Sequence, residues 1–222
     1  MTKKYELVLD DTISFWGWKL FRIRALISFG SIEAGDLGGY IEKEDNLSHD
    51  GNAWVYGDAK VSGNAKVWGN AEVSGNAKVW GDAKVSGNAE VSGDAKVWGN
   101  AKVWGDAKVS GNAEVSGDAK VSGNAKVSGN AEVSGNAEVS GNAEVSGNAE
   151  VSELGDIIVF KNHWSSGRHF TYTKSNKMWK VGCFYGTGQE LIKKAYRDSE
   201  KSGNYYKAYV DFVETLERLS EE

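Results

Sequence analysis

Residues 75–98 read GNAKVWGDAKVSGNAEVSGDAKVW, which is four copies of one six-residue unit. The unit Gly-(Asn/Asp)-Ala-(Lys/Glu)-Val-(Ser/Trp/Tyr) runs from Gly51 to Ser152 in seventeen consecutive copies, without an insertion or a deletion. Only Trp54 departs from the pattern at the Lys/Glu position. Self-similarity at a fixed short period is typical of solenoids, so the repeat decides the architecture.

The period of six favours a short strand and a turn over a helix. One glycine in every six residues would destabilise a helix. Side chains alternate along a strand, so Ala and Val of each unit point to one side and the polar residues to the other. Gly-Asn and Gly-Asp tolerate the left-handed backbone of a sharp turn. A disordered low-complexity tract is the alternative, but disorder does not require Val and Ala to keep phase through seventeen units.

Three units per coil give 18 residues per turn, so the 102 repeat residues predict about six coils of a triangular, single-stranded parallel β-helix. The fold class is therefore mainly β. We divide the chain into an N-terminal β-rich segment over 1–50, the β-solenoid over 51–152, and a C-terminal α+β cap over 153–222. Ile41 and Leu47 are already six residues apart, so the first coil is expected to begin near Asp36.

The cap is expected to cover the open end of the solenoid, where strand edges and the apolar core would otherwise meet water. Strands are predicted over 157–160, 169–173 and 178–181. A capping box from Thr187 to Glu190 opens a helix that is expected to turn Leu191, Ile192, Ala195 and Tyr196 inward. Ser202-Gly-Asn204 is expected to break this helix. A second helix is then predicted, whose inward residues lie at 4-3-4-3 spacing: Tyr205, Tyr209, Phe212, Leu216 and Leu219.

Composition excludes several classes of function. The net charge of −5 argues against a protein that binds nucleic acid through bulk charge. Cys183 is the only cysteine, so no intramolecular disulfide is possible. Glu6, Asp10 and Asp11 interrupt what would be the core of a signal peptide, and no stretch approaches the roughly 18 apolar residues of a membrane span. We expect a soluble, cytoplasmic protein that does not bind membranes.

The unit Val-Ser-Gly-Asn-Ala-Lys resembles the hexapeptide repeat of left-handed β-helix proteins, a family best known for CoA-dependent acyltransferases. The resemblance implies a left-handed coil. The flanks are similar to a group common in phages and bacterial prophages, whose members are often labelled acetyltransferases from the repeat alone. This similarity implies a bacterial host cell, and it rests on residues 20–24, 35–42, 46–48, 51–55 and 182–187.

The histidine that these acyltransferases use as a general base has no counterpart in the repeats. Residues 52–152 contain no histidine and no inserted loop that would carry one. His49, beside the first coil, is the best remaining base, but a lone histidine near a turn is more often structural. Cys183 with His163 or His169 would make a nucleophile–base pair in principle, although we expect Cys183 to be a small buried core residue. These three residues also fall short of the four ligands of a structural zinc site.

The outward positions of the rod carry the remaining information. Residues 18 apart stack, which places Trp80 over Trp98 on one face beside a column of Lys60, Lys78 and Lys96. Trp68 and Trp104 fall on a second face, two coils apart, with Ser86 between them. Three interpretations stay open: a recognition face for an anionic or aromatic ligand, a self-association face, or a surface covered by a terminal segment. The predicted binding residues are Trp68, Trp80, Trp98, Trp104, Lys78 and Lys96.

The sequence therefore predicts a non-enzymatic β-solenoid scaffold or binding protein of phage or prophage type, without a catalytic residue, metal or cofactor. It would act through a host or phage protein partner or by assembling into a dimer or trimer. A counter-defence factor that blocks or sequesters a host component is the more specific form of this hypothesis. A CoA-dependent acyltransferase is the alternative.

Overall fold

The computed structural model describes residues 3–220, and the chain forms two compact units, Met1–Leu154 and Gly155–Glu222. The first unit joins the N-terminal segment to the whole repeat region. The second unit is an antiparallel sheet with two helices. A 3-10 turn, Leu154–Asp156, connects them along the chain.

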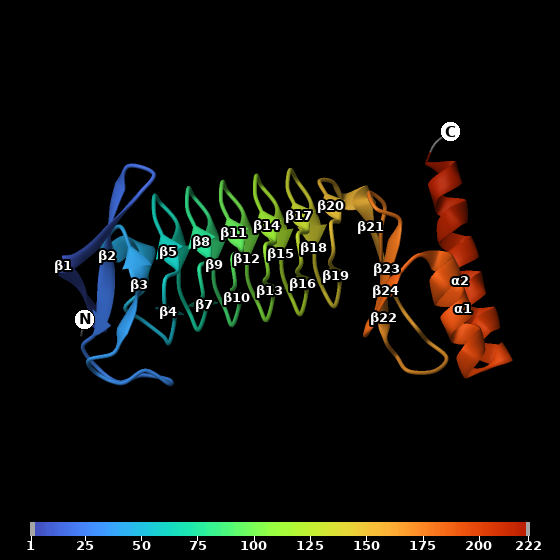
Figure 1. The fold of residues 1–222 in the computed structure, drawn as a ribbon, viewed down its shortest axis with the longest axis horizontal. Helices are drawn as coiled ribbons and strands as arrows, with labels where there is room; N and C mark the ends of the chain where they lie inside the picture. Colours follow the sequence, from blue (N-terminus) through green and yellow to red (C-terminus); the bar gives the residue numbers. More distant parts are fainter. Residues whose placement is uncertain (1–2, 221–222) are drawn as a thin grey trace. The chain divides into compact units, whose positions relative to one another are not determined.

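Each repeat contributes one two-residue strand, formed by the residue at the Lys/Glu position and the following valine. The strands form three parallel rows, which Figure 1 shows along the rod. We call them the β4 row, the β5 row and the β6 row after their first repeat strand. The β4 row contains β4 (Trp54–Val55), β7 (Glu72–Val73), β10 (Glu90–Val91), β13 (Lys108–Val109), β16 (Lys126–Val127) and β19 (Glu144–Val145). The β5 row contains β5 (Lys60–Val61), β8 (Lys78–Val79), β11 (Lys96–Val97), β14 (Glu114–Val115), β17 (Glu132–Val133) and β20 (Glu150–Val151). The β6 row contains β6 (Lys66–Val67), β9 (Lys84–Val85), β12 (Lys102–Val103), β15 (Lys120–Val121) and β18 (Glu138–Val139).

The interior of the repeat coils is lined by the alanines and valines of the repeat. Every one of them from Ala53 to Val151 is at most 1% exposed. Neighbouring coils are joined by backbone hydrogen bonds of nearly constant length, for example from Lys96 N to Ala113 O at 2.9 Å. The predicted β-solenoid of about six turns with 18-residue coils is confirmed. The left hand of the coil stays a prediction.

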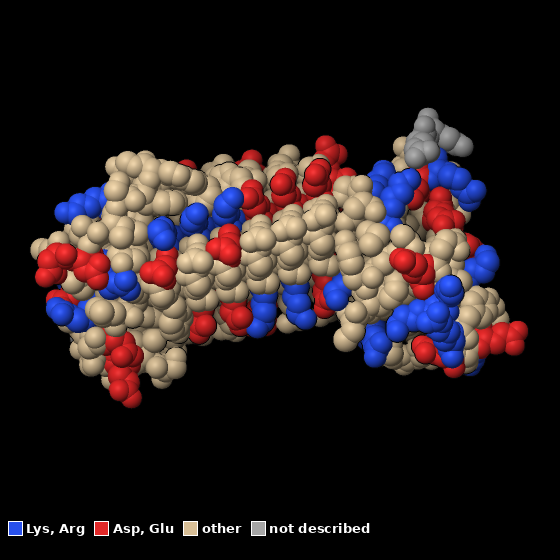
Figure 2. All heavy atoms as spheres, viewed as in Figure 1, with Lys and Arg blue, Asp and Glu red and all other residues tan. Residues whose placement is uncertain are grey.

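Polar side chains at the corners and on the faces also pair between coils. At one corner, the Asn70 amide donates to Asn88, and Asn88 donates to Asp106, at 3.0 and 2.8 Å. On the faces, opposite charges one coil apart form ion pairs, such as Lys96 with Glu114 at 2.6 Å. Figure 2 shows basic groups over the early coils of one row and acidic groups over the later ones. The charges along this row therefore change from basic to acidic, and the Lys96–Glu114 ion pair lies at the change.

The N-terminal segment extends the β5 row. β1 (Tyr5–Phe15) and β2 (Trp18–Ala25) form a hairpin, β3 (Leu37–Ile41) pairs with β2, and β3 then pairs in parallel with β5. The hairpin turn is Trp16-Gly17, and both residues have positive φ, at 48° and 88°. Two positive φ values in a two-residue loop match the right-handed twist of the flanking strands.

Two buried side chains supply the hydrogen-bond donors that a preceding coil would supply to the first coil. Within the rod, the Gly and Ala carbonyls of a unit accept backbone N–H groups from the preceding coil. At the first coil, Lys4 Nζ donates to Gly51 O and Ala53 O at 3.3 and 2.8 Å. Asn46, which closes the 3-10 turn Glu44–Asn46, donates in the same way to Gly63 O and Ala65 O at 3.1 and 2.9 Å. The open edge is thus satisfied by side chains, as a buried carbonyl requires.

Burial lowers the pKa of Lys4 to about 8, although the nearby Asp50 carboxylate acts in the opposite direction. The side chain is only 1% exposed, and its ammonium also lies 4.8 Å from the centre of the Phe29 ring. The carbonyl acceptors and the ring face give the charge partial compensation. The stability of the first coil is therefore expected to depend on pH through Lys4.

The second unit is a four-stranded meander with both helices on one face. Its strands are β21 (Ile157–Lys161), β22 (His169–Thr173), β23 (Met178–Val181) and β24 (Phe184–Gly186), in that order across the sheet. α1 (Gly188–Asp198) and α2 (Glu200–Leu219) follow. The three predicted strands are present, and the capping box is confirmed, since Glu190 N donates to Thr187 Oγ1 at 3.3 Å. The core is Phe170, Tyr172, Trp179, Val181, Leu191, Val210 and Val213.

The predicted helix break at Ser202-Gly-Asn204 is wrong. The break lies at Ser199, whose hydroxyl accepts from Ser202 N at 3.0 Å and so caps α2. Gly203 is buried inside α2, where a Cβ would lie 2.1 Å from the Tyr196 ring. This glycine lets the two helices approach closely, which a local sequence signal does not separate from a helix stop.

The predicted inward face of α2 is also wrong at two positions. Phe212 and Leu219 are 54% and 62% exposed, whereas Val210 and Val213 are buried. The close approach at Gly203 fixes the rotation of the helix, and Val210 and Val213 lie on the same side as this glycine, at helical spacing. On α1, Leu191 and Ala195 are buried as predicted, but Tyr196 is exposed.

Cys183 is exposed, which corrects the prediction of a buried core thiol. It lies with Gly182 in the two-residue turn between β23 and β24, where Val181 pairs with Phe184. The short strand β24 was not foreseen, so the turn before it was missed. Within residues 3–220, no helix has both the length and the apolar character needed to cross a membrane.

Candidate functional site

The two tryptophans of the β5 row form a stack that is partly covered by the N-terminal hairpin. Trp80 and Trp98 have ring centres 5.0 Å apart and planes within 4° of each other. The Trp16 ring, at the tip of the β1–β2 hairpin, meets Trp80 edge-on at 5.0 Å. Phe15 stacks on Trp16, and Lys78 Nζ lies 5.8 Å from the centre of the Phe15 ring. Of the three interpretations, coverage by a terminal segment describes Trp80 best.

The two predicted lysines of this row have partners within the chain. Lys78 lies beside the hairpin tip, and Lys96 donates to Glu114 Oε1 at 2.6 Å. Trp80 and Trp98 are half-buried. Trp80 and Lys78 therefore contact the hairpin, Lys96 pairs within the rod, and the β5 row offers less free surface than the sequence predicts.

The tryptophans of the β6 row are uncovered. Trp68 and Trp104 are 38% and 37% exposed, and no other tryptophan of the repeats reaches this exposure among the described residues. They border a groove of about 490 Å³ that we call the Trp68–Trp104 groove. Its lining residues are Trp68, Lys84, Ser86, Lys102, Val103, Trp104 and Lys120. Ser86 forms the floor between the two indoles because it occupies the same repeat position in the intervening coil.

One side of this groove is a column of lysines. Lys84, Lys102 and Lys120 stand two residues before the Trp/Ser column on successive strands of the β6 row. Lys120 pairs with Glu138. No carboxylate of residues 3–220 lies within ion-pair distance of the ammonium groups of Lys84 or Lys102. The acidic residues nearest in the repeat, Asp82 and Asp118, accept hydrogen bonds from Asn64 and Asn100 at 3.1 and 3.0 Å.

The arrangement suits recognition of an aromatic or anionic ligand. Two indole faces and two ammonium groups without carboxylate partners surround a small groove. Indoles stack on flat rings, and lysines bind anions. The described lining of the groove supplies the Ser86 hydroxyl and the amines of Lys84, Lys102 and Lys120, but no histidine. His49 lines a separate cavity that Trp68 also borders.

His49, the best base predicted from the sequence, has a structural place. Its ring stacks on Tyr5 at 4.3 Å, and its Nδ1 accepts the Lys4 backbone N–H at 3.2 Å. Its Nε2 is buried and lies 3.7 Å from Glu44 Oε2, too far for a hydrogen bond but close enough for an ion pair when protonated. Lys3 hydrogen-bonds Glu44 and is the main reason that the pKa of this carboxyl is lowered. His49 thus helps to seat the N-terminal segment.

His163 and His169 lie in the second unit. His163 Nδ1 is 3.0 Å from the Tyr209 hydroxyl, which ties the β21–β22 loop to α2. Within the described residues of the chain, no group of three or more His, Cys, Asp or Glu residues is arranged to hold a metal ion.

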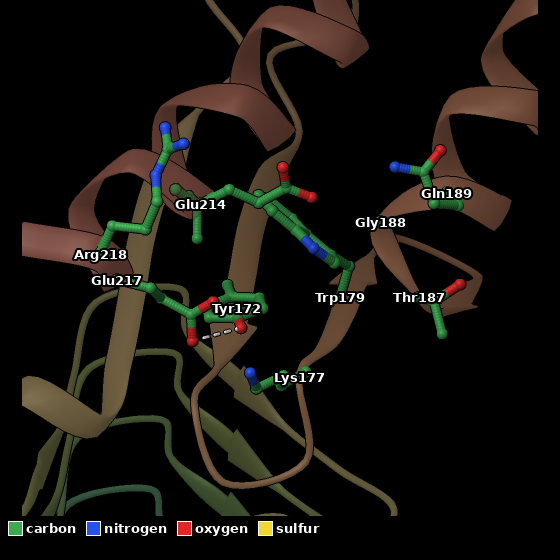
Figure 3. A pocket seen from close by; sticks show the side chains of 10 residues that line it. Tyr172, Lys177, Trp179, Thr187, Gly188, Gln189, Glu214, Glu217 and Arg218 are labelled. Atoms are coloured by element: carbon green, nitrogen blue, oxygen red, sulfur yellow. Dashed lines mark hydrogen bonds between the residues drawn. The ribbon is translucent and has the colours of Figure 1, made fainter. Parts of the chain in front are cut away.

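A second cavity, also of about 490 Å³, lies in the second unit and was not foreseen from the sequence. Figure 3 shows its side chains arriving from the β22–β23 hairpin, the start of α1 and the end of α2. The Tyr172 hydroxyl donates to Glu217 Oε1 at 2.7 Å, and burial followed by this carboxylate raises the pKa of Tyr172. Lys177 and Arg218 face Glu214 and Glu217 across a lining of mixed charge. A tyrosine held protonated beside a carboxylate stabilises the helix–sheet contact.

No protein-family model matches this chain, and no curated protein matches its sequence.

Proposed function

We propose that this protein is a non-enzymatic β-solenoid binding scaffold that presents the Trp68–Trp104 groove to a ligand. The observation that carries the proposal is the exposure of these two indoles on a rod whose other tryptophans are buried or partly covered. Exposed aromatic groups beside cations on a rigid surface are typical of recognition sites. A solenoid with a continuous Val/Ala core holds such groups at fixed distances, which reduces the entropic cost of binding.

The resemblance of the flanking sequences to phage and prophage proteins suggests a biological setting for this scaffold. A rigid rod without a catalytic set suits a protein that withholds a host component rather than converting it. We therefore propose a counter-defence role in a bacterial host cell, in which the groove sequesters a host ligand.

Co-purification from bacterial cells tests the scaffold proposal. Native mass spectrometry compares the wild type with the double variant Trp68→Ser/Trp104→Ser and with Trp98→Ser, which changes the same repeat position on the neighbouring row. We expect a bound species that the wild type and Trp98→Ser retain and the double variant loses. The same species at the same occupancy in all three proteins, or none in the wild type, contradicts the proposal. Light scattering on the same proteins identifies a second copy of the chain as the species if the double variant alone becomes lighter.

The alternative, a CoA-dependent acyltransferase, makes a different prediction. An acyltransferase would release free thiol from acetyl-CoA in the presence of an amine or hydroxyl acceptor. We expect no release above the buffer rate, because His49 stacks on Tyr5, its Nδ1 already accepts the Lys4 backbone N–H, and the described lining of the groove has no histidine. Thiol release that His49→Gln abolishes would support the enzyme and overturn the scaffold proposal.

A further inference from the structure

The spacing of the two uncovered indoles defines a gap of one coil. Trp80 and Trp98, in consecutive coils, have centres 5.0 Å apart and nearly parallel planes. One coil therefore separates two indoles at this repeat position by about 5 Å, close to the roughly 4.8 Å between stacked strands. Trp68 and Trp104 occupy the same repeat position two coils apart. In the same orientation, their ring centres are about 10 Å apart, and one flat ring between them needs about 7 Å, at roughly 3.5 Å for each contact.

The lysine column adds a charge requirement to this shape. Lys84 and Lys102 stand two residues from the Ser86 and Trp104 positions, roughly 6.5 Å along each strand. Their ammonium groups have no carboxylate partner within residues 3–220, so an anion bound there does not compete with an existing ion pair. A group that satisfies both features carries a flat aromatic ring and a phosphate within one short molecule.

We propose that the Trp68–Trp104 groove binds a free nucleotide, with its base between the two indoles and its phosphate on Lys84 and Lys102. This inference rests on the proposed function, since it names the ligand class of the same groove. A free nucleotide fits better than a nucleic-acid strand for two reasons. The row holds a single gap, whereas a strand needs a series of stacking platforms. The chain as a whole also carries a net charge of −5, which disfavours a strand with many phosphates.

Calorimetric titration of the full chain with AMP, GMP, CMP and UMP at low salt measures binding directly. We expect the purine nucleotides to bind more tightly than the pyrimidine ones, because a larger ring stacks over more of each indole. Adenosine and ribose 5-phosphate serve as probes with only the base or only the phosphate, and each is expected to bind at least tenfold more weakly than AMP. Ribose 5-phosphate binding as tightly as AMP, or failure of all four nucleotides to bind, overturns the inference.

Single substitutions separate the two contributions. Trp68→Ser and Trp104→Ser are each expected to weaken AMP binding roughly 5- to 150-fold, the range measured for loss of one base–aromatic stack. Lys84→Gln/Lys102→Gln is expected to weaken binding and to flatten its dependence on salt. Trp98→Ser is expected to leave AMP affinity unchanged. Equal affinity in wild type and Trp104→Ser overturns the inference.

Filling the gap gives a test that does not depend on a destabilised protein. Ser86→Trp adds an indole between Trp68 and Trp104, in the same one-coil relation that Trp80 has to Trp98. We expect AMP binding to be lost while the melting temperature stays the same or rises. Ser110→Trp, at the same repeat position on the β4 row, is the matched control and is expected to bind AMP like the wild type. Wild-type AMP binding in the Ser86→Trp protein overturns the inference.

The outcomes also separate this inference from the scaffold proposal. If no nucleotide binds but a different species is retained by the wild type and lost by Trp68→Ser/Trp104→Ser, the scaffold stands and the nucleotide falls. If a 12-residue single-stranded oligonucleotide binds and AMP does not, the groove serves a strand and the free-nucleotide assignment is wrong. If the double variant retains everything that the wild type retains, both proposals fall.

Discussion

A matched pair of glycines measures what the stacking of the corners contributes to stability. Gly123 and Gly141 lie at the same corner in consecutive coils, with φ values of 67° and 64°. A Cβ at Gly123 would lie 3.0 Å from Gly141 N and 3.1 Å from Gly141 O. A Cβ at Gly141 would meet nothing within 4 Å. Alanine therefore meets the same backbone conformation at both sites but a steric obstacle only at Gly123.

The expected costs follow from these contacts. A left-handed alanine costs about 1–2 kcal/mol, of which about 0.5–1 kcal/mol is offset because glycine loses more entropy on folding. Gly141→Ala should therefore lower the free energy of unfolding by about 1 kcal/mol. Gly123→Ala must also push the two neighbouring backbones apart by about 0.5 Å to restore normal carbon contacts, and overpacking of this kind costs about 1–3 kcal/mol. We expect Gly123→Ala to be the less stable variant by about 1–3 kcal/mol.

Urea denaturation followed by circular dichroism of the β signal measures the difference, provided that the slope against urea is the same in both variants. The flanking sequences, Ser-Gly-Asn-Ala-Lys and Ser-Gly-Asn-Ala-Glu, differ at one position, and the two differing residues, Lys126 and Glu144, form an ion pair with each other at 3.3 Å. Equal losses in the two variants would show that coil-to-coil contact at the corners is not what selects glycine, and the steric argument would be refuted.

Three further perturbations test other regions of the molecule. Lys4→Met removes the donor to Gly51 O and Ala53 O and should cost about 1–3 kcal/mol at pH 7. The pKa of Lys4 is lowered from 10.5 to about 8, so the unfolded chain binds more protons than the folded chain between these pH values. The stability of the wild type should therefore rise relative to that of Lys4→Met from pH 8 to 10, by at most about 1.4 kcal/mol per pH unit. A difference in melting temperature between the two proteins that does not change with pH contradicts this prediction. Trp16→Ser removes the edge contact on Trp80 and should speed amide exchange of the β1–β2 hairpin roughly 2- to 10-fold while the repeats are unaffected; unchanged exchange would mean that this contact does not hold the hairpin. Thr187→Ala breaks the capping box with Glu190 and should destabilise the second unit by about 1 kcal/mol, with Thr187→Ser restoring most of the loss in urea denaturation monitored by helical circular dichroism.

The rod could be predicted from the sequence because each coil obeys a local rule. Ala and Val alternate with polar residues, Gly opens each corner, and residues 18 apart meet. The two-coil separation of Trp68 and Trp104 followed from the same rule. Which row remains uncovered did not follow, since it depends on where the Trp16 hairpin lies in space.

The wrong predictions for the second unit concern residue types that are compatible with two structural roles. Gly203 has the sequence appearance of a helix stop, but it is needed for close packing against Tyr196. Val210 and Val213 have helical spacing, and so do the residues at 205, 209, 212, 216 and 219. Which of the two sets is buried depends on the surface against which α2 packs. Lys4 and Asn46 gave no signal at all, because a lone polar residue in an N-terminal segment is ordinarily solvated.

The uniform interior of the rod has a consequence for how the chain finds its native alignment. A strand paired one coil too early or too late would bury the same valine and alanine, so the core alone does not reject the error. Discrimination therefore rests on residues that differ from coil to coil. Lys4, Asn46 and Trp54 lie at the first coil, Trp16 contacts Trp80, and ion pairs such as Lys96–Glu114 join particular coils. The many equivalent coils therefore stabilise the rod, and a small number of non-repeated residues fix its register.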